Sequence, residues 1–79
     1  MTLPSSNTQT STQKANHLTA RQLQILNMLS LGCTRSEVAA AMQISYGTVD
    51  RQLDVIFEVL GADNALHAVA TALRRGFIK

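Results

Sequence analysis

The sequence predicts an all-α domain built from four short helices. Its 79 residues are rich in Ala, Leu and Gln, and only three of them are aromatic, a composition that favours helices over sheets. In four successive segments apolar residues recur at intervals of three and four, and a Ser, Thr or Asn stands just before each segment. A single domain of this size has a small core, so we expect oligomerisation or close helix packing to support it.

The start of the chain differs in composition from the rest. Residues 1–16 are mostly Thr, Ser, Gln and Asn. Such a segment buries too little apolar surface to offset the entropy of ordering. We therefore expect a disordered polar tail over 1–16 and a helical domain over 17–79.

The first helix is expected between Thr19 and Gly32. Thr19 is a good N-cap residue, and Leu18 can pack as a hydrophobic staple against Leu23. Gly32 can end the helix in the left-handed conformation. The buried stripe of this helix is predicted to be Ile25, Leu26, Met28 and Leu29.

The second helix, at about 35–42, has the most specific local signal in the chain. Thr34 is its predicted N-cap, and Glu37 stands three residues later, where it completes a capping box. A run of alanines in this helix permits the close approach of a neighbouring helix.

The third helix, at about 46–60, is expected to follow after a tight turn. Ser45 is its predicted N-cap, Gly47 tolerates the backbone of a turn or a helix start, and Gly61 ends the helix. Its apolar stripe has helical spacing and consists of Val49, Leu53, Ile56 and Leu60. The second and third segments therefore form a helix-turn-helix in outline.

The fourth helix is predicted to begin after Asn64 and to end at Gly76, with Phe77 and Ile78 folding back as an apolar end. One face of this helix carries Leu66, Val69, Ala70 and Leu73.

A series of residues at fixed spacing runs through all four segments: Leu18, Thr19, Arg21, Ile25, Leu26, Gly32, Thr34, Glu37, Val38, Ala39, Met42, Ile44, Ser45, Thr48, Val49, Leu60, Gly61, Asn64, Ala68, Val69, Ala72 and Gly76. The series resembles, without a gap over about 18–78, the C-terminal DNA-binding domain of the LuxR/GerE/FixJ group of bacterial transcription regulators. The resemblance implies a four-helix domain in which the second and third helices are the helix-turn-helix and the fourth commonly pairs two copies. In layout the chain is similar to short stand-alone members of the GerE kind.

The resemblance also implies roles for single residues. The phosphate-contacting hydroxyls of the family correspond to Thr34 and Thr48, and its turn serine corresponds to Ser45. Arg35 and Tyr46 are expected to help position the DNA backbone. Solvation of Arg35 and packing of Tyr46 in the turn are the alternatives.

The third helix departs from the family in its charge. Positions that usually carry cations hold Asp50 and Asp54. A carboxylate near phosphates costs free energy through repulsion, although Asp50 could accept a hydrogen bond from a cytosine amino group. Arg51, with Gln52 and Asp50, is the candidate for reading bases, but Arg51 could instead bridge Asp54 or Asp50 on its own helix.

Two functions follow from these features. The first is a DNA-binding transcription regulator, bacterial and cytoplasmic, that forms a homodimer through Leu66, Val69, Ala70 and Leu73 and places its third helix in the major groove of double-stranded DNA. The second is a small antagonist or co-regulator on the same fold that binds another regulator protein and binds DNA weakly or not at all. The second is favoured by the carboxylates and by an apolar strip of Leu23 and Leu31 on the first helix.

Other functions find no support in the sequence. Cys33 is the only cysteine, which excludes an intramolecular disulfide and the usual thiolate zinc site. His17 and His67 have no companion ligands close in sequence, so we expect neither a metal nor another cofactor. No catalytic motif and no apolar run long enough to span a membrane is present, so an enzyme and a membrane protein are not expected.

Overall fold

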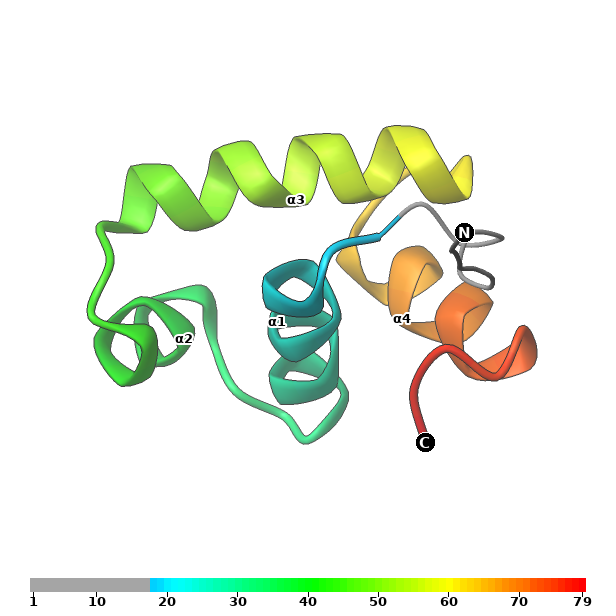
Figure 1. Cartoon of the computed structure of the whole chain (residues 1–79), viewed down its shortest axis with the longest axis horizontal. Helices are drawn as coiled ribbons and strands as arrows, with labels where there is room; N and C mark the ends of the chain where they lie inside the picture. Colours follow the sequence, from blue (N-terminus) through cyan, green and yellow to red (C-terminus); the bar gives the residue numbers. More distant parts are fainter. Residues whose placement is uncertain (1–17) are drawn as a thin grey trace, which may run out of the picture.

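The computed structural model describes residues 18–79, and over this range the chain forms four helices and no strand (Figure 1). The predicted all-α fold is confirmed. The helices are α1 at Ala20–Ser30, α2 at Arg35–Met42, α3 at Tyr46–Leu60 and α4 at Ala65–Arg74. The predicted tail over 1–16, and His17, lie outside the described residues.

Capping boxes fix the starts of α1 and α2. At α2, Thr34 Oγ1 accepts a hydrogen bond from Glu37 N at 3.1 Å, and Thr34 N donates to Glu37 Oε1 at 2.7 Å, as the sequence predicts. At α1, Thr19 makes the same reciprocal pair with Gln22, at 3.1 and 3.0 Å. The sequence predicts Thr19 as the N-cap, and the pairing with Gln22 that completes this second box is a finding of the structure. Each box satisfies backbone N–H groups that a helix start leaves unpaired.

The turn between α2 and α3 is held by one residue that the sequence did not indicate. Gln43 takes the left-handed conformation, with φ of 59°, and ends α2. Gly47, expected at a turn or a helix start, lies in the first turn of α3. Ser45 Oγ caps α3 by accepting from Thr48 N at 3.0 Å. The side chain of Ser45 therefore caps the start of α3. The left-handed backbone of Gln43 ends α2 and turns the chain toward α3.

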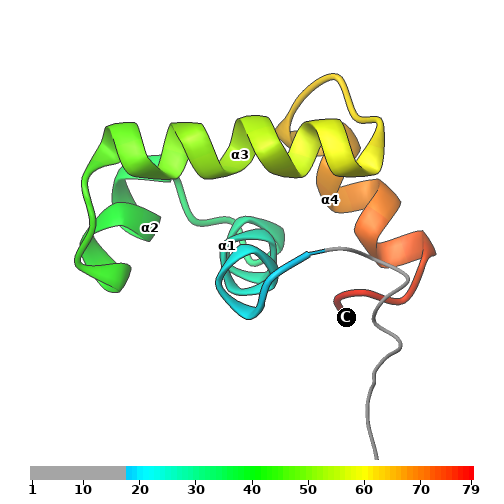
Figure 2. The same ribbon diagram turned by 45° about the horizontal axis from the view of Figure 1, so that its top comes forward.

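The four helices are arranged around α3, the longest of them. Figures 1 and 2 both show α3 lying across α1, with α2 near its first residues and α4 near its last. Within the described range α2 and α4 make no contact with each other, and both contact α1 and α3. One side of α3 therefore faces the other helices, and none of the four described helices covers its opposite side.

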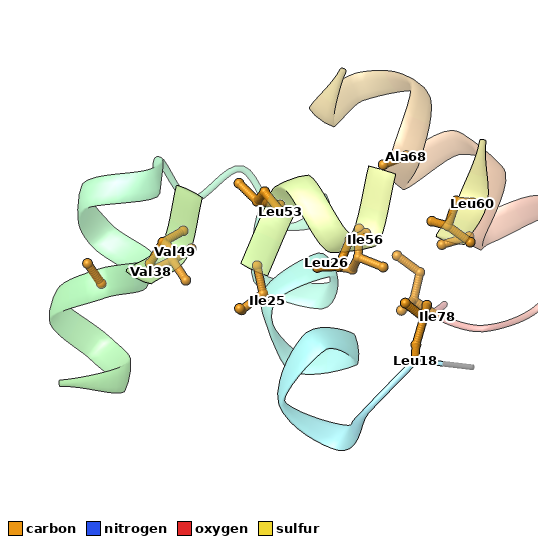
Figure 3. Close-up of a cluster of buried hydrophobic side chains, with 12 residues drawn as sticks. Leu18, Ile25, Leu26, Val38, Val49, Leu53, Ile56, Leu60, Ala68 and Ile78 are labelled. Atoms are coloured by element: carbon orange, nitrogen blue, oxygen red, sulfur yellow. The ribbon is translucent and has the colours of Figure 1, made fainter. Parts of the chain in front are cut away.

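The core runs beneath the whole length of α3 (Figure 3). Val38 of α2 meets Val49 near the start of α3, and Ile25 of α1 lies below Leu53. At the far end the core is closed by Leu18, Leu26, Ile56, Leu60, Ala68 and Ile78. Burial of a Leu or Ile side chain stabilises a fold by about 1.5 to 3 kcal/mol, so these side chains supply much of the stability of so small a domain.

The buried stripe of α1 and the apolar C-terminal end agree in outline with the prediction. Ile25 and Leu26 are fully buried, Met28 and Leu29 are partly buried at the edge of the core, and Ile78 is buried. The exposed strip predicted on α1 is wrong in part, because Leu23 packs against the core cluster. Leu31 alone of that pair is well exposed, since it lies at the C-cap, beyond the packed part of the helix.

Candidate nucleic-acid interface

The interface is built on α2, the turn and α3. Two buried valines, Val38 and Val49, join the two helices from inside. The turn is closed by backbone hydrogen bonds from Ile44 N to Ala39 O at 3.0 Å and from Gln43 N to Ala40 O at 3.3 Å. The angle between α2 and α3 is therefore fixed by the backbone as well as by packing, which makes the pair a rigid helix-turn-helix.

The uncovered side of α3 carries polar and charged residues. Its exposed residues are Tyr46, Gly47, Arg51, Asp54, Val55 and Glu58. Of the predicted site residues, Thr34 and Ser45 are also exposed, and Arg35, Thr48, Asp50 and Gln52 are half-buried. All nine predicted site residues are thus accessible at least in part. Each lies in α2 or α3, or is the N-cap residue of one of these helices.

Asp50 is paired across the two helices. Arg35 Nη1, in the first residue of α2, donates to Asp50 Oδ1 of α3 at 2.5 Å. The sequence had offered Arg51 as a partner for Asp50 or Asp54, but among the described residues Arg51 makes no ion pair. Arg35, which was predicted to contact DNA, and Asp50, which was predicted to repel it, therefore neutralise each other. The charge of Arg51 is not neutralised by any described residue.

The hydroxyl of Thr48 also has a partner within the protein. Its Oγ1 lies 2.8 Å from Ser45 Oγ, which accepts from Thr48 N as the N-cap of α3. The two hydroxyls lie beside the first backbone N–H groups of α3, where the helix dipole favours an anion. An anionic group docked here would meet hydroxyls and N–H groups that already have fixed positions.

Gln52 lies at the junction of α3 with α1. Its Oε1 accepts a hydrogen bond from Gln22 Nε2 at 3.0 Å, and Gln22 is itself buried. Gln52 is one of the residues predicted to read bases, and its bond to Gln22 is not evident from the sequence. The signal that could have found it is a polar residue on the inner side of α1, where the neighbouring positions are apolar.

The predicted dimer face of α4 is exposed. Leu66 is 82% exposed and Leu73 is 44% exposed, and Val69 and Ala70 between them are half-buried. The opposite face packs into the molecule through Ala68, Thr71 and Ala72. Val69 also packs against the core cluster, so the apolar surface that the rest of residues 18–79 leaves uncovered on α4 is mainly that of Leu66 and Leu73.

The rest of the described chain offers no other site. Residues 18–79 contain no pocket and no group of three His, Cys, Asp or Glu side chains placed to hold a metal. No single helix in that range is long and apolar enough to cross a membrane, and α3 and α4 meet the length and composition test only as a pair bent by 50°.

A rigid helix-turn-helix with its second helix uncovered defines a domain of the class that binds DNA. The family model described as bacterial regulatory proteins of the luxR family, GerE, matches residues 16–72. The chain belongs to this family of DNA-binding helix-turn-helix transcription regulators, as the resemblance implied.

Two curated relatives come from Bacillus subtilis (strain 168). The chain is 30% identical over 66 residues to the transcriptional regulatory protein DesR, a match covering 84% of this chain and 33% of DesR. It is 33% identical over 63 residues to the uncharacterized transcriptional regulatory protein YvfU, covering 80% of this chain and 32% of YvfU. The chain thus spans about a third of the length of these relatives.

Solved structures share the fold. The transcription factor GerE superposes with a TM-score of 0.75 at 24% identity, covering 78% of this chain and 92% of GerE, which shows the fold alone. The response regulator ChrA of a heme-sensing two-component system gives a TM-score of 0.76 at 36% identity, covering 77% of this chain and 30% of ChrA. VqmA of Vibrio cholerae, a LuxR-type receptor described as a dimer in the absence of its target DNA, gives a TM-score of 0.76 at 28% identity, covering 89% of this chain and 33% of VqmA.

Proposed function

We propose that this domain binds double-stranded DNA as a homodimer and regulates transcription, with α3 lying in the major groove. The observation that carries the proposal is that the other helices of residues 18–79 pack along one side of α3 only and leave its other side uncovered (Figures 1 and 2). A major groove admits one α-helix. Membership of a DNA-binding family supports the same docking.

Contacts to the DNA backbone are assigned to the N-terminal ends of α2 and α3. Thr34 and Tyr46 are exposed there, and Thr48 holds its hydroxyl beside the cap of α3. Arg35 lies at the same place, and it can turn to a phosphate only when its ion pair with Asp50 opens. With that pair closed, the groups at this end supply hydroxyls and N–H groups, which donate hydrogen bonds to phosphate oxygens in protein–DNA complexes.

Base reading is assigned to Arg51, with Asp50 beside it. Arg51 is exposed and unpaired within the described residues, so its guanidinium is free to donate to guanine O6 and N7. Asp50 is half-buried and keeps one carboxylate oxygen, Oδ2, outside its bond to Arg35, and that oxygen can accept from a cytosine amino group. Asp54 lies one turn further along, where a carboxylate repels phosphates and selects against docking in other registers.

The homodimer is assigned to the exposed face of α4. Two copies joined through Leu66, Val69, Ala70 and Leu73 would bury apolar surface that each monomer leaves in water. A two-fold axis at α4 presents two α3 helices to DNA, so we expect half-sites about one helical turn apart. The dimer described for VqmA supports pairing in a related protein.

A second candidate function is favoured by the charge of α3. Its uncovered side carries Asp54, Glu58 and the apolar Val55, and Arg51 is the cation there that makes no ion pair within residues 18–79. Such a surface suits a protein partner better than phosphates. In this function the chain is an antagonist or co-regulator that pairs with another regulator and binds DNA weakly or not at all.

A salt titration separates the two functions. The affinity of the full chain for a fluorescent duplex of mixed sequence is measured by anisotropy from low to high salt. A DNA-binding regulator loses affinity steeply, with a slope of log K against log salt of about 0.9 for each phosphate neutralised. An absence of binding at low salt, where these electrostatic contacts are strongest, would overturn the first function and favour the second.

A further inference from the structure

Three residues form a chain of hydrogen bonds from the start of α1 to the middle of α3. Thr19 N donates to Gln22 Oε1 at 3.0 Å, and Gln22 Nε2 donates to Gln52 Oε1 at 3.0 Å. Gln22 is 7% exposed, so its amide cannot exchange these partners freely for water. The side chain of Gln52, in contrast, is only half-buried and reaches the surface of α3.

The direction of every bond in this chain is fixed by its first member. A backbone N–H can only donate, so the Gln22 atom facing Thr19 must be the carbonyl oxygen. The NH₂ group of Gln22 then faces Gln52 and must find an acceptor there. The only acceptor in a glutamine side chain is its carbonyl oxygen, so Gln52 turns Oε1 inward and keeps both N–H groups of Nε2 free of this chain.

A glutamine whose oxygen is already bonded inside the protein cannot make its usual paired contact with a base, which needs both an acceptor and a donor. The paired contact of Gln with adenine uses Oε1 to accept from N6 and Nε2 to donate to N7. Gln52 can still donate, but Oε1 already holds the bond from Gln22. Oε1 keeps a second lone pair, but it is directed toward the buried Gln22, so the N–H groups of Gln52 are the part of the side chain that is left for a ligand. N–H groups select hydrogen-bond acceptors.

We infer that Gln52 is a dedicated hydrogen-bond donor of the DNA interface and that Gln22 is the positioning residue that sets this polarity. The DNA group that it contacts is an acceptor, either a phosphate oxygen or an acceptor on a base edge such as guanine O6 or N7 or thymine O4. The inference rests on the proposed function, since it gives a hydrogen-bond polarity to one residue of the same site and names the residue that sets it. It links the capping box of α1 to the chemistry of α3.

The substitution Gln22→Glu tests the polarity. A Glu at this position still completes the capping box with Thr19, but its second oxygen can only accept. Gln52 must then turn Nε2 inward and expose Oε1. Gln24→Glu is the matched control, because it places the same charge on an exposed position of α1 two residues away.

Side-chain amide exchange measured by NMR reads this polarity without DNA. In the unaltered protein we expect slow exchange for the Nε2 protons of Gln22 and exchange close to that of exposed Gln24 for those of Gln52. In the Gln22→Glu variant the protons of Gln52 become slow. Slow exchange at Gln52 in the unaltered protein, or no change in the variant, would overturn the assignment.

DNA affinity tests the role of the free donor. Gln52→Leu keeps the Thr19–Gln22 bonds of the α1 cap and removes both the free donor and the acceptor of Gln22 Nε2, so we expect a loss of DNA affinity of about three- to tenfold. The salt slope should stay unchanged, because no charge is removed. Gln22→Glu should cause a similar loss, Gln24→Glu a smaller one, and Gln22→Glu should add little in the Gln52→Leu background.

Measuring the loss of affinity on several duplexes of different DNA sequence identifies the acceptor. An equal loss on duplexes of different sequence indicates a phosphate, and a loss confined to some sequences indicates a base edge. Both support a dedicated donor. If the unaltered protein binds DNA and Gln52→Leu binds equally well, the role of Gln52 is overturned and the proposed function stands; if the unaltered protein binds no DNA, the proposed function itself fails.

Discussion

Arg35 on α2 and Asp50 on α3 form an ion pair, with Nη1 and Oδ1 2.5 Å apart. The two side chains are 37% and 43% exposed, so water screens the pair and its contribution to folding is small. The pair matters for DNA binding because it occupies the guanidinium of Arg35. While the pair is closed, the only arginine on the first turn of α2 is directed at a carboxylate instead of a phosphate.

Asp50→Asn should release Arg35 and strengthen DNA binding. We expect affinity for a mixed-sequence duplex to rise by about three- to tenfold, with the salt slope increasing by about 0.9 because one more phosphate is neutralised. The free energy of unfolding should change by less than about 1 kcal/mol. Asp54→Asn is the control, since it removes a carboxylate from the same helix without releasing a cation; equal slopes for both variants would contradict this account.

The charge of α3 as a whole gives a second prediction. Changing Asp50 and Asp54 together to Lys should raise non-specific DNA affinity by well over tenfold if α3 lies in the groove, because two repulsive groups become attractive. Asp63→Lys serves as the comparison for net charge, as Asp63 is exposed in the loop after α3. Binding that depends on net charge alone, whatever the position, would count against this docking.

The exposed face of α4 gives a third prediction. Leu66→Glu should convert a dimer to a monomer at micromolar concentration, because a charge at the centre of an apolar interface is left unpaired. The mass is read by analytical ultracentrifugation. Leu31→Glu is the matched control, since Leu31 is 75% exposed but lies at the end of α1. Neither variant should unfold the monomer, and a mass that Leu31→Glu lowers and Leu66→Glu leaves unchanged would place the interface elsewhere.

Two neighbouring residues of α3 should differ sharply in their effect on stability. Leu53 is fully buried against α1, so Leu53→Ala should lower the free energy of unfolding by about 2 to 5 kcal/mol. Val55 is 45% exposed, and Val55→Ala should stay within about 0.5 kcal/mol of the unaltered protein. Urea unfolding followed by circular dichroism measures both, and similar losses would mean that the two sides of α3 are wrongly assigned.

The fold could be predicted from local signals in the sequence, namely the N-cap residues and the spacing of apolar residues. Thr34 with Glu37, Ser45 and Asn64 fix three helix starts by bonds that reach only three residues along the chain, so each could be predicted alone. Apolar spacing then gave the buried side of α3. The left-handed Gln43 was missed because that conformation is set by the packing of α2 on α3, and glutamine has no special preference for it.

The candidate site followed only in part. Its residues were placed on the right elements by resemblance, but their partners were not. Arg35 is 15 residues from Asp50, and Gln22 is 30 residues from Gln52. Contacts at such separations depend on how helices cross, and composition or spacing along one helix carries no information about them. For this reason the sequence could not show that Asp50 pairs with Arg35 instead of Arg51, or that Gln52 bonds to Gln22.

The packing of α3 along a single side has a bearing on how such a regulator diversifies. Arg51, Asp54 and Glu58 contribute nothing to the buried core, so substitutions there alter what the molecule touches and leave its folding nearly intact. The surface that meets a binding partner can therefore vary independently of the inner row of leucine, isoleucine and valine that holds the domain together.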